Sequence, residues 1–188
     1  MSKYPFFTPI DEVLFQKRIV QIHGPVGSEL AERVNRELLA MEAHDEKKPI
    51  HVYINSPGGE VTSGFSIFDT LRFIRCDIKT IVTGLAASMG SIIALAAKKE
   101  NRLAFPNSKF LIHQPLVSGM IRGSASEIEI HAKDIIKIRE RINQLYAKET
   151  GRPVEEVRQA TDRDNWMDPE EAVSFGLISR IVANHGEL

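Results

Sequence analysis

The stretch Ile50-His51-Val52-Tyr53-Ile54-Asn55-Ser56-Pro57-Gly58-Gly59 decides the fold class of this 188-residue chain. Its first five residues have the alternating pattern of a β-strand, and the proline and two glycines that follow predict a tight turn. Phe65, Phe68, Leu71 and Ile74 then recur at helical spacing. A strand, a glycine turn and a helix in this order predict an α/β fold with crossover connections.

The same switch of periodicity recurs on both sides of this stretch. Further strands are predicted over 18–22, 78–82, 109–112 and 177–182. Further helices are predicted over 28–41, with Ser28 as the cap, and over 88–97, 126–150 and 168–176. The helix over 126–150 is too long to lie wholly against a small core, so we expect it to project and meet a partner. We predict an N-terminal arm over 1–13 and one domain over 14–188.

The composition excludes several classes of protein. Lys and Arg total 24 and Asp and Glu total 25, a formal net charge of −1, which lacks the basic surplus of a nucleic-acid-binding protein. Hydrophobic residues make up 43% of the chain and charged residues 26%, so most of the chain is expected to fold rather than remain disordered.

Targeting and redox signals are sparse. Cys76 is the only cysteine, so neither an intramolecular disulfide nor a cysteine-based zinc site can form. The N-terminus lacks the apolar core of a secretory signal. The most apolar stretch, 84–97, is shorter than the ~20 residues that span a bilayer. We therefore expect a cytoplasmic, soluble protein with no membrane or nucleic-acid partner.

Two glycine-rich turns carry candidate chemistry. In Gly84-Leu85-Ala86-Ala87-Ser88-Met89-Gly90, small residues flank Ser88 between a strand and a helix, as in a nucleophile elbow, and the Met89 N–H lies nearby. The alternative is an N-cap serine in an Ala-rich packing segment. In Asn55–Gly59 the glycines let backbone N–H groups approach a ligand, and the alternative is a plain tight turn.

A serine nucleophile needs a base and an acid that orients it. Of the six histidines, His113 ends an apolar strand, where functional side chains collect in α/β folds; the alternative is a capping histidine. Asp162 and Asp164 both precede the last helix and are both candidates for the acid. His131 lies four residues after Glu127, a metal-binding or simply solvated pair.

Five sequence blocks together resemble the proteolytic subunit family of the Clp protease, ClpP. They are Tyr53–Gly59, Gly84–Gly90, Pro106-Asn107-Ser108, Ile112-His113-Gln114-Pro115 and Thr161-Asp162-Arg163-Asp164. They occur in the order and approximate spacing of that family and cover about 18–182.

The resemblance implies specific roles at the site. Ser88 would be the nucleophile, His113 the general base and Asp164 the residue that holds the imidazole. The oxyanion-hole N–H groups would belong to Gly59 and Met89. The residues that bind substrate would be Gly58, Gly59 and Leu116. The family uses no metal or cofactor.

The resemblance also implies an architecture and partners. The fold would be the ClpP/crotonase-like spiral of ββα units, with a projecting handle (about 116–150) where two stacked heptameric rings of this chain meet. Asp162 and Arg163 would link the rings. Tyr53 and Phe73 would receive loops of a hexameric AAA+ unfoldase of the ClpX, ClpA or ClpC type, which feeds unfolded polypeptides into the chamber.

Two departures from the family pattern suggest a mixed assembly with a second ClpP paralogue. The resemblance begins only near Leu14, and 116–124 is about two residues longer than usual. Two alternative functions stay open: a crotonase-type acyl-CoA hydratase or isomerase, which shares the fold, and a non-catalytic ring subunit of a mixed Clp complex.

Overall fold

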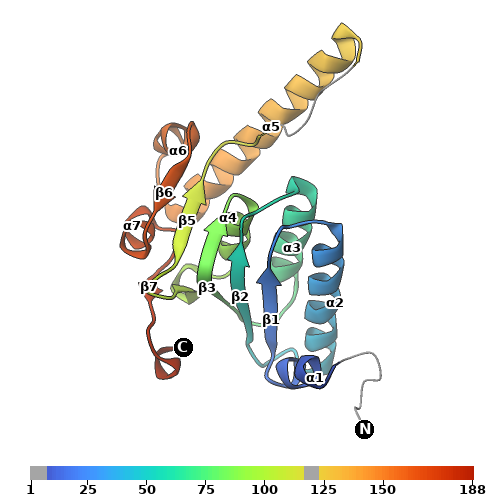
Figure 1. Cartoon of the computed structure of the whole chain (residues 1–188), viewed down its shortest axis with the longest axis vertical. Helices are drawn as coiled ribbons and strands as arrows, with labels where there is room; N and C mark the ends of the chain where they lie inside the picture. Colours follow the sequence, from blue (N-terminus) through green and yellow to red (C-terminus); the bar gives the residue numbers. More distant parts are fainter. Residues whose placement is uncertain (1–7, 117–122) are drawn as a thin grey trace.

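A seven-stranded sheet forms the centre of the computed structural model, which describes residues 8–116 and 123–188 (Figure 1). Its strands are β1 (Ile19–His23), β2 (Ile50–Ser56), β3 (Ile78–Ala87), β4 (Arg102–Ala104), β5 (Lys109–Ile112), β6 (Asn165–Met167) and β7 (Arg180–Ile181). The helices are α1 (Pro9–Gln16), α2 (Ser28–His44), α3 (Val61–Phe73), α4 (Met89–Ala94), α5 (Ala125–Thr150), α6 (Val154–Thr161) and α7 (Pro169–Phe175). The predicted α/β class is confirmed.

The sheet divides at β3. Strands β1, β2, β3, β4 and β7 lie side by side and are parallel. The first part of β3 pairs with β4 through Thr80–Val82, whereas its last part pairs with β5 through Leu85–Ala87. Strand β6 then pairs with β5 in the antiparallel direction. The end of β5 therefore lies beside the end of β3, where the chain turns into α4.

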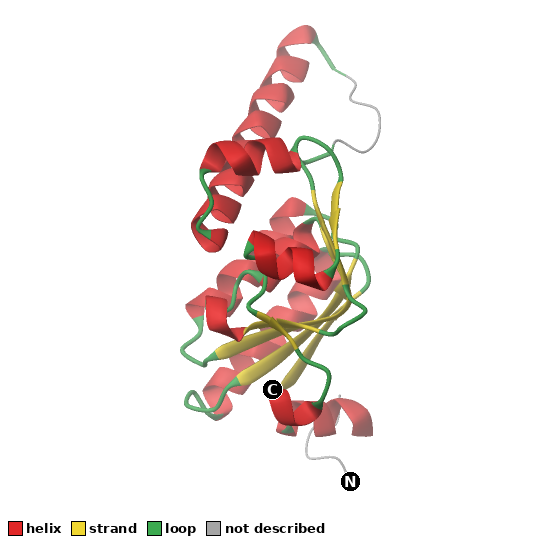
Figure 2. Ribbon diagram, turned by 90° about the vertical axis from the view of Figure 1, so that its left-hand side faces the viewer, coloured by secondary structure: helices red, strands yellow, loops and turns green. Residues whose placement is uncertain are grey.

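Helices α2 and α3 pack on the same side of the sheet (Figures 1 and 2). Helix α2 buries Ala31, Val34, Leu38 and Met41 at three- and four-residue spacing, as an amphipathic helix does. The prediction that Ser28 caps this helix is wrong. Gly27 occupies the N-cap position without a side-chain bond, and Ser28 is the first helical residue.

The predicted long helix is confirmed as α5, and it projects beyond the sheet (Figure 1). It begins with a capping box, in which Ser124 and Glu127 bond each other's backbone amides, and Gly151 ends it with a left-handed φ of 78°. Its first ten residues are all exposed, and Ile130 and Ile136 keep 66% and 55% of their surface accessible. One chain therefore leaves apolar side chains of α5 uncovered.

The described part of the N-terminal region, from residue 8 onward, begins with helix α1. Helix α1 starts with a capping box between Thr8 and Asp11, and Phe15 is buried in the main core. The predicted boundary between residues 13 and 14 falls inside this helix. Residues 1–7 of the predicted arm and 117–122 of the predicted handle lie outside the described residues, and the division into domains stays a prediction.

Other differences concern short elements. The helix predicted over 88–97 is only Met89–Ala94, and the strand predicted over 177–182 is only Arg180–Ile181. Strands β4 and β6 and helix α6 have no counterpart in the prediction. Three-residue strands show too few alternations to be recognised, and they form here because neighbouring strands supply their hydrogen bonds.

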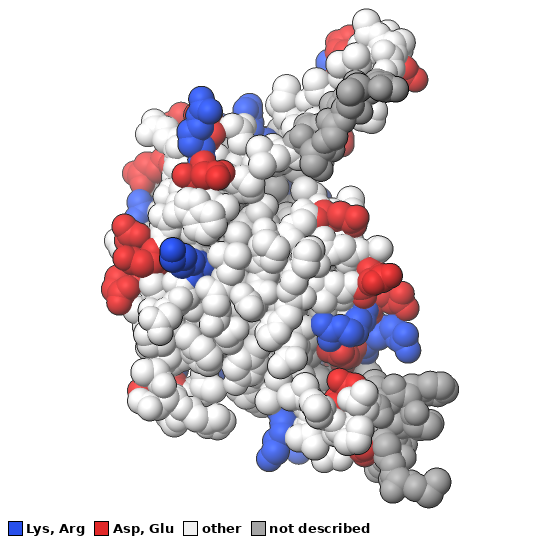
Figure 3. Space-filling view, viewed as in Figure 1, with Lys and Arg blue, Asp and Glu red and all other residues white. Residues whose placement is uncertain are grey.

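The face seen in Figure 3 carries its Lys, Arg, Asp and Glu side chains around the periphery, with few over the strands. The centre of this face therefore offers few charged side chains to a partner. Within residues 8–116 and 123–188, no helix is both long and apolar enough to cross a membrane. The same residues contain no group of three metal-ligating His, Cys, Asp or Glu side chains.

Candidate active site

Ser88 lies on a strained turn between β3 and α4. Its φ is 53° and its ψ is −123°, and among the described residues only Arg18 is another non-glycine residue with a positive φ. Such strain persists only where the surrounding structure holds it. The Ser88 N–H donates to the Leu111 carbonyl at 2.9 Å. Ser88 occupies the N-cap position of α4, but its hydroxyl makes no capping hydrogen bond. The alternative role of Ser88, as a serine whose side chain caps the helix, is therefore not supported.

Gly58 lies directly behind Ser88. Its φ is 87°, and a Cβ built there would be 2.6 Å from the Ser88 Cβ and 2.9 Å from the Met89 nitrogen. The neighbouring Gly59 has a φ of 152° and forms an isolated bridge with Val26. Only glycine allows the two turns to approach this closely.

Two backbone amides near Ser88 have no acceptor among the described residues. The Val26–Gly59 bridge uses the Gly58 carbonyl, at 2.8 Å from the Val26 nitrogen, and the Glu60 N–H, at 2.8 Å from the Val26 carbonyl. It does not use the Gly59 N–H. Within the described parts of the chain, the amides of Gly59 and Met89 donate to no acceptor. Both amides are therefore available to donate to a bound ligand.

His113 follows β5, and its side chain is 12% exposed. Its Nδ1 lies 3.3 Å from Oδ1 of Asp164. The distance is that of an ion-pair contact, but the pair does not have the geometry of a hydrogen bond. Nδ1 is a buried polar atom that has no hydrogen-bond partner among the described residues. The pair is therefore adjacent but not fully aligned.

Strand pairing selects Asp164 over Asp162 as the neighbour of His113. Ile112 pairs with Asn165 across the antiparallel strands β5 and β6, which brings His113, the residue after Ile112, opposite Asp164, the residue before Asn165. The Gln114 N–H donates to the Thr161 carbonyl at 2.6 Å, and its side chain donates to the Asp162 carbonyl at 2.8 Å. The Asp162 carboxylate instead lies 3.7 Å from Arg163 Nε.

The remaining predicted residues lie on the surface. Leu116 is 74% exposed, and the side chains of Asp162 and Arg163 are 68% and 94% exposed. Tyr53 packs against a small second cluster, whereas Phe73, which is 79% exposed, ends α3 on the side of the main core. The docking role of Tyr53 and Phe73 stays a prediction.

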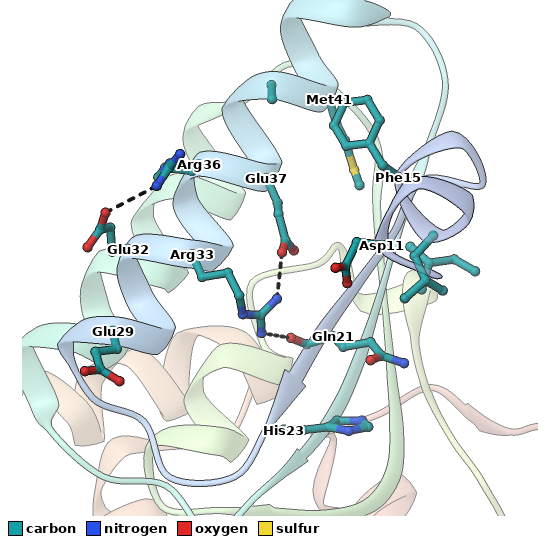
Figure 4. A pocket seen from close by; sticks show the side chains of 13 residues that line it. Asp11, Phe15, Gln21, His23, Glu29, Glu32, Arg33, Arg36, Glu37 and Met41 are labelled. Atoms are coloured by element: carbon teal, nitrogen blue, oxygen red, sulfur yellow. Dashed lines mark hydrogen bonds and ion pairs between the residues drawn. The ribbon is translucent and has the colours of Figure 1, made fainter. Parts of the chain in front are cut away.

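A hollow of about 820 Å³ lies apart from these residues, between α1, β1 and α2 (Figure 4). Arg33 crosses it, 2.7 Å from the Glu37 carboxylate, and also donates to the Gln21 carbonyl at 2.5 Å. Burial raises the pKa of Glu37, against the opposing effect of Arg33. None of the candidate catalytic residues lines this hollow.

Two residues near the site were not predicted. Ser91 lies 2.6 Å from the Ser88 carbonyl and 2.6 Å from the Tyr146 hydroxyl, which comes from α5. The available signal was weak, namely one hydroxyl in an apolar run and one phenol on an apolar helix face. Sequence spacing does not show that two such positions, 55 residues apart, meet.

Comparison with known proteins defines the class. The family model described as Clp protease matches residues 5–185. The ATP-dependent Clp protease proteolytic subunit 2 of Treponema denticola is 50% identical over 182 residues, which cover 95% of this chain and 90% of that protein. The ATP-dependent Clp protease proteolytic subunit 3 of Rhizobium etli is 47% identical over 175 residues, 93% of this chain and 89% of that protein.

These matches and the α/β fold define a peptidase-type protein. The chain belongs to the Clp protease family. The predicted resemblance is confirmed. Membership of this family favours a peptidase over the crotonase-type alternative.

Proposed function

We propose that this chain is a serine endopeptidase subunit in which Ser88, His113 and Asp164 act together. The observation that carries the proposal is the Ser88 turn, whose hydroxyl makes no capping bond while its backbone is tied to β5, two residues before His113. His113 removes the hydroxyl proton as Ser88 attacks the peptide carbonyl. The same imidazole then protonates the leaving amine, and Asp164 stabilises the imidazolium.

The oxyanion of the tetrahedral intermediate accepts hydrogen bonds from Gly59 and Met89. Their amides are unused in the described structure, and each such donor contributes roughly 3 kcal/mol to transition-state stabilisation. Water then releases the acyl group by the reverse sequence of proton transfers. Gly58, Gly59 and Leu116 line the path of an extended peptide, which pairs with the enzyme backbone.

The proposed working form is two stacked heptameric rings of this chain that bind an AAA+ unfoldase. The unfoldase hydrolyses ATP, and proteolysis of folded substrates therefore depends on ATP. The uncovered isoleucines of α5 support a contact between copies of the chain, and the two relatives carry "ATP-dependent" in their names. Tyr53, which packs against the second cluster, and the exposed Phe73 at the end of α3 receive loops of the unfoldase. The unfoldase delivers unfolded polypeptide into the closed chamber.

The test is Ser88→Ala in the full chain, with a fluorogenic peptide and a fluorophosphonate probe that acylates reactive serines. We expect the wild type to hydrolyse the peptide and to take up the probe, and the variant to lose both. Residual catalysis would be ~10³–10⁴ above water at best. The matched control is Ser66→Ala, which removes an exposed serine hydroxyl that accepts a hydrogen bond from the Asn35 side chain at 2.8 Å.

Two results contradict the proposal in different ways. Near wild-type hydrolysis by Ser88→Ala would show that another residue is the nucleophile. A wild-type chain that neither cleaves peptide nor reacts with the probe, alone or with a second paralogue, would instead indicate the non-catalytic ring subunit.

A further inference from the structure

A buried chain of hydroxyl groups connects the projecting helix α5 to the Ser88 turn. The Ser91 Oγ lies 2.6 Å from the Ser88 carbonyl oxygen. The Tyr146 hydroxyl lies 2.6 Å from the same Oγ. Tyr146 and Ser91 are each 1% exposed, so water does not compete for these bonds.

The direction of each proton follows from the chemistry of the groups. A carbonyl oxygen only accepts, so the single Ser91 proton is used for the Ser88 carbonyl. Tyr146 must then donate its proton to the Ser91 Oγ. Burial raises the pKa of Tyr146 above its ordinary value, despite the opposing effect of Ser91, so the phenol keeps this proton at neutral pH. The result is a one-way chain from Tyr146 through Ser91 to Ser88.

The end of this chain belongs to the same peptide unit as a proposed oxyanion donor. The Ser88 carbonyl and the Met89 N–H are the two ends of one planar group and point in opposite directions. Any rotation of that plane displaces both. The carbonyl also accepts from the Ser91 and Ile92 amides at 3.0 and 3.3 Å, but these bonds come from the short helix α4 itself. Among the residues that the structure describes, only the hydroxyl chain ties the plane to a different element, α5.

We propose that Tyr146 is a positioning residue that acts through Ser91 to hold the Ser88–Met89 peptide plane, and with it the Met89 N–H, in the orientation that binds the oxyanion. This inference rests on the proposed peptidase function. It makes the base of the projecting helix part of the support of the site, so that a shift of α5 changes how well the tetrahedral intermediate is bound.

The test compares Tyr146→Phe, Ser91→Ala and the double variant of the full chain, with rates normalised to the number of serines that a fluorophosphonate titrates. We expect each single variant to lower kcat between about threefold and thirtyfold with little change in KM, since a displaced donor loses part of its ~10²–10³-fold effect. The double variant should match Ser91→Ala, because Tyr146 acts only through Ser91.

A second measurement isolates the oxyanion. A peptide boronic acid forms a tetrahedral adduct on Ser88, and its affinity should fall by about the same factor as kcat. The affinity for a product peptide, which forms no such adduct, should stay within about twofold of wild type. The matched control is Thr80→Val, which removes a 1% exposed hydroxyl that donates at 2.8 Å to the Ala94 carbonyl, at the other end of α4. It should leave kcat and boronate affinity unchanged.

Several results would overturn the inference while leaving the proposed function intact. They are wild-type kcat and boronate affinity in Tyr146→Phe, additive losses in the double variant, or an equal loss in Thr80→Val. A wild-type chain that shows neither hydrolysis nor labelling of Ser88 overturns the proposed function itself, and the inference with it.

Discussion

At the scale of single residues, the site depends on how closely two turns approach each other. Gly58 has no side chain and a φ of 87°, and the atoms nearest to its missing Cβ are Ala87 O, Ser88 Cβ and Met89 N. Backbone atoms cannot move aside as the end of a flexible side chain can. One methyl group at this position must therefore displace Ser88, the proposed nucleophile, or Met89, the proposed oxyanion donor.

Gly58→Ala tests this point. We expect kcat to fall by ~10²-fold, since displacement of a reacting group by ~1 Å costs about that much. The free energy of unfolding should fall by about 1–3 kcal/mol from the positive φ and the overpacking. Peptidase assays and denaturant titration measure the two effects. Gly186→Ala is the control, since nothing lies within 4 Å of its added carbon; a Gly58→Ala variant as active as this control would contradict the proposed geometry.

At the scale of elements, a buried ionic cluster holds the base of α5 to the sheet. Glu149, in the last turn of α5, lies 2.8 Å from Arg72 of α3 and also pairs with Arg102 of β4. Arg102 is 2% exposed, and it also donates to the Ala97 and Glu149 carbonyls at 2.8 and 2.9 Å. Burial by itself would raise the pKa of Glu149, but the bonds from Arg72 and Arg102 outweigh it and lower this pKa.

Glu149→Gln should lower the free energy of unfolding by about 3 kcal/mol at pH 7, because it leaves the buried Arg102 without a counter-charge. The lowered pKa sets the sign of the pH effect. The stabilisation by the ionised carboxylate is present above the unfolded pKa of about 4.5 and is lost as the pH falls through the lower folded value.

Denaturant titration of wild type and variant at pH 7, 5 and 3 checks this prediction. The gap between the two should narrow only at the lowest pH. A gap that is constant over this range would mean that the charge of Glu149 contributes nothing. Arg158→Gln is the control, since its pairs with Glu140 and Glu155 are exposed and should contribute less than about 1 kcal/mol.

At the scale of the whole molecule, the surface beside the His113–Asp164 pair is exposed to solvent in one chain. Arg163 is 94% exposed and is joined by one peptide bond to Asp164. The neighbouring Nδ1 of His113 lacks an aligned hydrogen-bond partner among the described residues. Contact of this surface with a second ring would restrain Asp164 and improve that alignment.

Arg163→Ala should therefore weaken ring–ring contact and lower peptide hydrolysis together. A shift of Asp164 by ~1 Å misplaces the imidazole and costs up to ~10²-fold in rate. Analytical ultracentrifugation measures the assembly and a fluorogenic peptide measures the rate. The comparison is Arg36→Ala, which changes a 78% exposed arginine on α2, outside the proposed ring–ring contact. Single rings with full activity would refute the coupling, and double rings without activity would show that Arg163 acts locally.

Local sequence patterns were sufficient for much of this protein. Alternation in Ile50–Ile54 and helical spacing from Phe65 to Ile74 each encode which face is buried, so β2 and α3 were predictable one segment at a time. The small residues around Ser88 likewise mark a tight turn. The local pattern left Asp162 and Asp164 both open, and only the family resemblance pointed to Asp164. The His113–Asp164 contact and the Tyr146–Ser91 bond are seen only in the tertiary structure. Each contact joins groups about 50 residues apart, which come together only when β5 pairs with β6 or when α5 packs against α4. Local periodicity describes which face of one segment is buried, so it cannot predict such long-range contacts.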